Sequence, residues 1–291
     1  MNKEELSALV ADILRGMEAP STPCAVPKEE AQPERVAADV SNMDLRKLYM
    51  VKDPADGERF RKMKLHTSAR LGSGRAGARY KTLTMLRFRA DHAAAQDAVF
   101  SQVPEDFAEK NGLIPVQTRC KDKDEYLTRP DLGRCFDEEN GQIIRRAVPQ
   151  SPRVQIVVGD GLSSAACIAN AMDCLAAIRD GLKLKGIDMA QPLFVRYCRV
   201  GAGDAVGDLT GCELVCVLVG ERPGLVTDQS MSAYLTYRPH TGVSESARTV
   251  ISNIHDGGTP AVEAGAAVAE LIDTILKRKV SGVGLVAEAG A

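Results

Sequence analysis

Residues 154–186 decide the fold, because VQIVVGDG (154–161) is followed almost at once by SSAACIANAMDCLAAIRDGLKLKG (163–186). The first stretch is rich in branched aliphatic residues and ends in a Gly-Asp-Gly turn, which predicts a strand buried on both faces. The second stretch predicts a helix that begins directly after this turn. A buried strand followed by a helix is the repeating unit of parallel α/β sheets.

The same alternation continues on both sides of this unit. Expected strands lie at 113–120, 193–200, 213–224, 232–239 and 249–255. A further helix is expected within 128–146, and a last one over 259–279, starting at a threonine cap with proline in its first position. The segment GAGDAVGDLTG (201–211) is expected to be a linker with one helical turn. Residues 112–291 are therefore predicted to form a Rossmann-like α/β domain with a mostly parallel sheet.

The region upstream of this domain has a different composition. In residues 1–18, apolar residues recur at helical spacing, which predicts one amphipathic helix. Residues 19–40 contain four prolines and many charges without periodicity, which predicts a flexible linker. A tethered amphipathic helix is expected to bind a partner, the alternative being that it folds back onto the body. Residues 41–111 are expected to form a helical, basic N-terminal domain.

The net charge of −2 conceals a strong asymmetry. Residues 41–91 carry thirteen Lys and Arg against five Asp and Glu, a net charge of +8, whereas residues 1–40 have a net charge of −4. A local excess of this kind indicates phosphate groups, nucleic acid or an acidic partner surface, with a solvated face as the alternative. Within it, the glycine-rich loop GSGRAG (72–77) contains Arg75 and is flanked by Arg70 and Arg79, and such arginines can grip a phosphate or carboxylate or dock on a partner. The loop itself contains no aromatic residue, so nucleic-acid binding is not expected.

The composition also bears on the compartment. Eight cysteines are scattered through the chain without a CxxC pair, which is typical of reduced cytoplasmic thiols. The N-terminus does not read as a signal peptide, and no apolar run approaches the ~20 residues that a membrane-spanning helix needs. We therefore expect a cytoplasmic protein with no membrane partner.

The sequence offers little for self-contained chemistry. The four histidines are dispersed, so no catalytic residue and no metal site is predicted. The stretch Asn253-Ile-His255-Asp-Gly-Gly258 is one residue away from the D-x-H-x-x-G signature that ligates cobalt through histidine. The aspartate that would orient the imidazole is asparagine here, so His255 is not expected to be a cobalt ligand.

Ligands of doubly wound sheets bind beyond the carboxyl ends of the strands. This rule selects the turns at 159–164, 199–204, 220–224 and 253–258. The first of them, in VVGDGLSS (157–164), resembles a phosphate-binding turn, but it lacks both GxGxxG and GK[ST] spacing, and a capped helix start is the alternative interpretation.

Several long blocks resemble the ethanolamine ammonia-lyase small (light) subunit family, in the same order and at similar separations. They are FVRYCRV (194–200), LVGERPGL (218–225) and RTVISNIHDGGTPAVEAG (248–265), preceded by SARLGSGRAGARYKTLTMLRFRADHAAAQD (68–97), LTRPDLGR (127–134) and VVGDGLSSAA (157–166). The resemblance covers roughly residues 60–285.

This resemblance implies a subunit of an adenosylcobalamin-dependent enzyme that converts ethanolamine to acetaldehyde and ammonia. The family's large subunit is a TIM barrel that holds ethanolamine and the radical-generating end of the cofactor, and the small subunit covers the corrin from the other side. The implied cofactor contacts here are Val200, Glu221 and Val250, of which Val250 departs from a cysteine in the family. Glu221 can accept hydrogen bonds from the cofactor, or else brace the Arg222-Pro223 turn.

The leader adds a second implied partner. Its amphipathic helix on a proline-rich tether resembles the peptides that carry enzymes to the shell of a bacterial microcompartment, where ethanolamine catabolism often occurs. Two rival hypotheses remain, namely a stand-alone carrier of cobalamin or a phosphate ligand, and a complete nucleotide-dependent enzyme.

Overall fold

The computed structural model describes residues 43–44, 47–67 and 69–287, and the chain divides into two units, Met1–Asp39 and Val40–Ala291. The predicted helix at 1–18 and the predicted linker at 19–40 lie outside the described residues. The predicted domain boundary at residue 111 stays a prediction.

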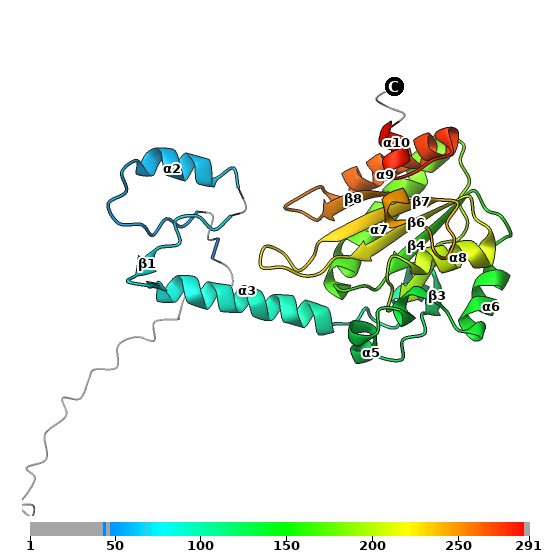
Figure 1. Cartoon of the computed structure of the whole chain (residues 1–291), viewed down its shortest axis with the longest axis horizontal. Coiled ribbons are helices and arrows are strands. Elements are labelled where there is room, and N and C mark those ends of the chain that lie inside the picture. Colours follow the sequence, from blue (N-terminus) through cyan, green and yellow to red (C-terminus); the bar gives the residue numbers. More distant parts are fainter. Residues whose placement is uncertain (1–42, 45–46, 68, 288–291) are drawn as a thin grey trace, which may run out of the picture. The chain divides into compact units, whose positions relative to one another are not determined.

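The centre of the second unit is a six-stranded sheet with the order β3-β5-β4-β6-β7-β8 (Figure 1). Its strands are β3 Ile114–Gln117, β4 Val154–Gly159, β5 Leu193–Arg196, β6 Leu214–Gly220, β7 Met231–Tyr237 and β8 Arg248–Ile254. β3, β5, β4 and β6 run parallel, whereas β7 is antiparallel to both β6 and β8. The prediction of an α/β fold with a mostly parallel sheet is therefore confirmed.

Helices cover both faces of this sheet. The four long ones are α6 Glu138–Ala147, α7 Ser164–Leu184, α8 Ala202–Thr210 and α9 Ala261–Arg278. Side chains alternate along a strand, so β6 sends Leu218 into the core shared with α7 and α9, and Val217 into the core shared with α6 and α8. Short elements complete the body, namely α4 Phe107–Lys110, α5 Lys123–Thr128, η2 Leu132–Arg134, η3 Glu245–Ala247 and α10 Val283–Ala287.

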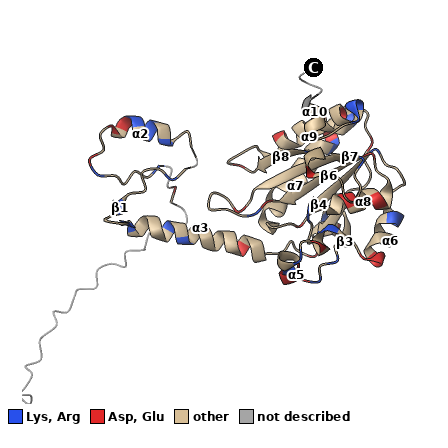
Figure 2. Ribbon diagram, in the orientation of Figure 1, with Lys and Arg blue, Asp and Glu red and all other residues tan. Residues whose placement is uncertain are grey.

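The part before the sheet contains α2 Gly57–Lys64, a small hairpin of β1 Arg75–Ala76 and β2 Arg79–Tyr80, and α3 Thr82–Phe100. Figure 2 shows Lys and Arg on α2 and on the first turns of α3. The hairpin was not predicted, and within the predicted helical domain 41–111 the described residues of NMDLRKLYMV (42–51) do not form a helix. Instead Lys64 Nζ donates to the carbonyls of Leu48 and Leu71, and Met50 N donates to Gly72 O, so the backbone of this stretch is held by residues distant in sequence.

Two local predictions from the sequence were wrong, one about a linker and one about a helix cap. The expected linker at 201–211 is the helix α8, because its glycines allow close packing: a Cβ on Gly203 would lie 2.6 Å from Val217. Thr259 does not cap α9, since Pro260 occupies the N-cap position. Thr259 N donates to Asn253 O and its carbonyl accepts from His255 N, so its backbone pairs with the end of β8 instead.

The described cysteines behave as packing residues. None of the seven in the described ranges forms a disulfide. Burial raises the pKa of Cys212 to about 11 and that of Cys174 to about 12, so both are neutral thiols at neutral pH. Within residues 43–287, apart from the undescribed gaps, no helix is long and apolar enough to cross a bilayer.

Candidate functional site

The four turns selected from the sequence lie at one edge of the sheet. β4, β5 and β6 are parallel to one another. β7 is antiparallel to both β6 and β8, so β8 runs in the same direction as β4, β5 and β6. The carboxyl ends of these four strands therefore share an edge, together with the start of β7. This edge is where the fold class places ligands.

Glu221 follows β6 at this edge, and its carboxylate is held by three donors of its own chain. Its Oε2 accepts from Ser230 Oγ at 2.8 Å, and its Oε1 accepts from Ser232 Oγ and from Asn253 N, the latter at 3.3 Å. Its own N–H donates to Ser230 O at 2.9 Å. Glu221 therefore does brace the protein, but through β7 and β8 rather than through the Arg222-Pro223 turn.

The bond to Asn253 stabilises an irregular point of β8. The register shifts here, because Met231 pairs with Ile254 while Ala233 pairs with Ile251, so β8 has one residue more than β7. Asn253 has a φ of 58°, in the left-handed region that non-glycine residues rarely adopt. The carboxylate of Glu221 accepts from the backbone N–H at this bulge and so helps to fix it.

Glu221 keeps some capacity for an external donor. An ionised carboxylate offers about four lone-pair sites, and three of them are used. The remaining site is on Oε2, and the residue is only partly buried. A ligand amide or hydroxyl can therefore still donate to Glu221.

Val250 lies on β8 directly across from Tyr234 of β7, which in turn pairs with Val217 of β6. Paired residues point to the same face of a sheet, so these three side chains form a row on the face that carries α8. Val217 is buried and Tyr234 is half-buried, whereas Val250 is 44% exposed. The row therefore ends in an apolar side chain open to a ligand or partner.

Tyr234 was not predicted as a site residue. Burial raises the pKa of its hydroxyl, and the nearby negative charge of Glu221 adds to this effect. The phenol therefore remains a neutral hydrogen-bonding group beside Glu221 and Val250. The sequence pattern that could have indicated it is the alternation of Ser232, Tyr234 and Thr236 with apolar residues in β7, which places these three polar side chains on one face of the strand.

Val200 does not end a strand, as was expected, because β5 stops at Arg196. It lies in the turn just before α8, where its carbonyl accepts from Gly203 N at 3.0 Å. The neighbouring Arg199 stacks over the ring of Tyr126, with its guanidinium carbon 4.3 Å from the ring centroid. Arg199 Nη2 donates to Tyr126 O, but its Nε is buried without any hydrogen-bond partner.

A buried polar cluster lies behind this edge, at the end of β4. Asp160 accepts from Ser164 Oγ at 2.6 Å and from Val103 N at 3.4 Å, and burial raises the pKa of its carboxyl. Lys123 donates to Gly161 O at 3.2 Å, and burial lowers its pKa. All of these hydrogen bonds are made between groups of the protein itself. They favour the interpretation of the Gly-Asp-Gly turn as a capped helix start, in which Ser163 caps α7, over a phosphate-binding turn.

His255 lies between β8 and α9, and its Nδ1 accepts from Gly257 N at 3.1 Å. An imidazole that accepts at Nδ1 carries its proton on Nε2 when neutral, so neither nitrogen has a free lone pair for a metal in this arrangement. In the described part of the chain, no group of three or more His, Cys, Asp or Glu residues is placed to hold a metal ion.

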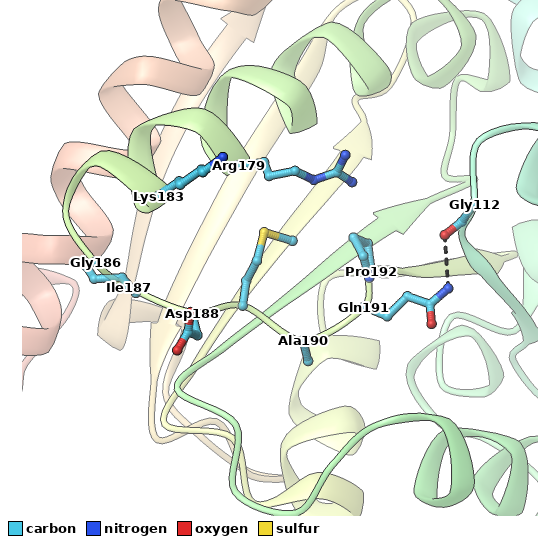
Figure 3. A pocket seen from close by; sticks show the side chains of 10 residues that line it. Gly112, Arg179, Lys183, Gly186, Ile187, Asp188, Ala190, Gln191 and Pro192 are labelled. Carbon is cyan, nitrogen blue, oxygen red and sulfur yellow. Dashed lines mark hydrogen bonds between the residues drawn. The ribbon is translucent and has the colours of Figure 1, made fainter.

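The hollow in Figure 3 lies at the opposite edge of the sheet. It has a volume of about 550 Å³ and is lined by the end of α7, the loop before β5 and Gly112, whose carbonyl accepts from Gln191 Nε2 at 3.2 Å. Arg179, Lys183 and Asp188 are also among its lining residues. None of Val200, Glu221 and Val250 contributes to it, so it is separate from the candidate site.

Comparison with known proteins assigns the family. The model of the ethanolamine ammonia-lyase light chain family matches residues 57–286. Ethanolamine ammonia-lyase small subunits from Clostridium perfringens and Clostridioides difficile are 53% and 54% identical to this chain, each over 98% of the chain and 100% of the relative. The small subunit from Lachnoclostridium phytofermentans is 56% identical over 85% of this chain and 83% of its own length. The chain belongs to the ethanolamine ammonia-lyase small-subunit family and is thus one part of a lyase complex.

Proposed function

We propose that this chain binds adenosylcobalamin together with the large subunit of ethanolamine ammonia-lyase, and that the complex converts ethanolamine to acetaldehyde and ammonia. The observation that carries the proposal is the identity of over 50% with named small subunits along nearly the whole chain. Val200, Glu221 and Val250 are the cofactor contacts implied by the family resemblance. Val200 and Glu221 lie at the carboxyl edge of the sheet, and Val250 lies within β8 on the face that carries α8, which supports a shared role.

The residues at this edge and on the adjoining face of the sheet fit a corrinoid. Cobalamin carries peripheral carboxamides and a phosphodiester in its nucleotide loop, so it offers both donors and acceptors. Glu221 Oε2 has room for one more donor, and Arg199 Nε is a buried donor without a partner beside Val200. The exposed side chain of Val250 and the ring of Tyr234 offer an apolar surface for the corrin periphery.

In this proposal, the chain's own residues bind and orient the cofactor. Glu221 accepts a carboxamide or ribose donor, Arg199 donates to an oxygen, and Val250 and Val200 exclude water from the apolar side. When bound, the cofactor supplies the radical that starts hydrogen abstraction from ethanolamine. No residue of this chain is assigned a catalytic role.

The basic N-terminal part is proposed to dock on the large subunit. Within α3, only Thr84 and Ala98 of its nineteen residues are buried in the described structure. Leu86 and Phe100 on this helix are 45% and 60% exposed, and Leu65 just after α2 is 67% exposed. Exposed apolar side chains among cationic ones favour an acidic protein surface with apolar patches over nucleic acid.

Residues 1–18 are proposed to attach the complex to the shell of a bacterial microcompartment within the cytoplasm. The support is the helical spacing of their apolar residues in the sequence and the proline-rich segment 19–40 that follows. This proposal is independent of cofactor binding, because it concerns another part of the chain.

A cobalamin-binding measurement tests the proposal. Hydroxocobalamin is titrated into the chain alone, into the cognate large subunit alone, and into the mixture of both, with free cobalamin separated by equilibrium dialysis. The proposal predicts that the mixture binds far more tightly than either component. Equally tight binding by the lone chain would favour a stand-alone carrier, and binding by the large subunit that is unaffected by this chain would contradict the proposed role of this chain.

A further inference from the structure

Arg248, the first residue of β8, forms a saturated and buried hydrogen-bond network. Its side chain is 3% exposed. Nη1 and Nη2 donate to the two carboxylate oxygens of Asp204, each at 2.8 Å. Nε and Nη2 donate to Glu245 at 2.8 and 3.2 Å, and Nη1 also donates to Thr236 Oγ1 at 3.2 Å. All five N–H donors of the guanidinium are therefore used within the chain.

The pair Arg248–Asp204 links two segments that are far apart in sequence. Asp204 lies in the first turn of α8, four residues after Val200. Arg248 lies two residues before Val250 on the same strand, and side chains two residues apart in a strand point to the same face. α8 packs on β6, and β7 lies between β6 and β8 in the sheet, so the ion pair spans β7.

The geometry of this pair specifies one arrangement. A bidentate bond forms only when the planar guanidinium and the carboxylate lie edge to edge, so it selects one placement of the first turn of α8 against β8. Buried ion pairs are weak evidence for stability, because apolar replacements are often as stable or more stable. The Arg248–Asp204 pair, whose hydrogen bonds are all made, is therefore better explained by its role in placing α8 against β8 than by a contribution to stability.

We propose that Arg248 is a positioning residue for the cobalamin site, whose bidentate bond to Asp204 fixes the spacing between Val200 and Val250. The inference rests on the proposed function, since it assumes that both residues contact the cofactor. It assigns Arg248 and Asp204 no contact with substrate or cofactor. Their effect passes through the turn before α8 and through strand β8.

The experiment uses the complex of this chain with its large subunit and measures the Kd for hydroxocobalamin, the melting temperature, and kcat at saturating adenosylcobalamin. Arg248→Lys keeps the charge but loses the planar fork, and Asp204→Asn keeps the shape but loses the bidentate acceptor. Ile272→Val is the matched control: this residue is fully buried in α9 in the core on the other face of the sheet, so it destabilises the fold without a route to the site.

We expect both single variants to raise the Kd by about tenfold, a weakening of ~1.4 kcal/mol, while kcat at saturation stays near that of the unaltered complex. The control is expected to lower the melting temperature with no change in Kd. Because the two residues act through one bond, the double variant should weaken binding no more than the stronger single variant. Asp204→Asn provides the same test if Arg248→Lys does not fold.

Three results would overturn the inference. The first is an unchanged Kd in variants whose melting temperature falls as far as that of the control. The second is additive weakening in the double variant, which would mean that the residues act separately. The third is a failure of the unaltered complex to bind hydroxocobalamin. This result would refute the proposed function itself, and it is recognised from the unaltered complex before any variant is measured.

Discussion

The carboxylate of Glu221 accepts a hydrogen bond from the backbone N–H of Asn253, although the two residues are 32 positions apart in the chain. This bond joins the end of β6 to the bulge at the end of β8, across β7. Together with Ser230 and Ser232, it fixes the carboxyl edge at the point where a ligand is expected. The same carboxylate thus has a structural role and the capacity for a ligand contact.

Glu221→Gln should separate these two roles. A glutamine can keep Oε1 towards Ser232 and Asn253 and let its amide donate to Ser230 Oγ, so the brace survives. Its neutral oxygen and its donating amide would no longer serve a cofactor donor, and a bond to a charged acceptor contributes about 1.5–3 kcal/mol. We expect the affinity of the subunit complex for cobalamin to fall about tenfold or more, with little loss of turnover at saturating cofactor.

Glu221→Ala is the comparison variant, since it removes the brace as well and should also lower the melting temperature. Cobalamin affinity and melting temperature, measured on the same preparations, report the two roles separately. An unchanged affinity in a well-folded Glu221→Gln complex would show that this carboxylate only braces β7 and β8.

Val250 gives a second test, because its side chain is 44% exposed on an edge strand. Val250→Asp should leave the fold stable, since surface substitutions usually change stability by no more than ~0.5 kcal/mol. The new charge would have to be desolvated against the corrin, so the cobalamin Kd should rise by about tenfold or more. Val250→Cys introduces the residue that the family resemblance implies at this position, and this variant should bind like the unaltered chain. Equal binding by the aspartate variant would exclude a contact at this residue.

The sheet could be predicted from sequence because its signals are local. The buried strand β6 is a continuous apolar run, and β4 is one apart from Gln155. The helices α7 and α9 are long enough to be distinguished from strands. The segment of α8 was expected to be a linker with one helical turn, because its two glycines, Gly203 and Gly207, normally indicate a loop. They are explained only by close packing on β6 and on Pro239, which is a property of the folded protein.

The site was predicted less completely. Glu221 and Val200 could be placed near strand ends from the order of elements, but the partners of Glu221 could not. Ser230, Ser232 and Asn253 reach it only through the antiparallel return of β7 and the bulge in β8. The Arg248–Asp204 pair likewise joins residues 44 positions apart, for which a single sequence has no spacing signal.

The role predicted for residues 1–18 can be tested without affecting the site. Deleting residues 2–18 should leave the activity of the reconstituted complex nearly intact and abolish its delivery to the microcompartment. Leu9→Glu combined with Ile13→Glu should act in the same way, because charges on the apolar stripe prevent docking of the helix. Fluorescence localisation and a melting curve provide the measurements, and a deletion that unfolds the body would contradict a targeting role.

The cobalt ligand is open to a spectroscopic test. Because His255 Nδ1 accepts from Gly257 N, we expect the benzimidazole of the cofactor to remain on cobalt. Electron paramagnetic resonance of the Co(II) state should show the same nitrogen hyperfine pattern after nitrogen-15 labelling of the protein with unlabelled cofactor. A change to the nitrogen-15 pattern would make a protein imidazole the ligand.

The most direct test of the central claim is an acetaldehyde assay on the purified chain, on the large subunit, and on both together, each with and without adenosylcobalamin. The account predicts turnover of ethanolamine only when both subunits and the cofactor are present. Turnover by the lone chain under any cofactor condition, or full turnover by the large subunit without this chain, would contradict it.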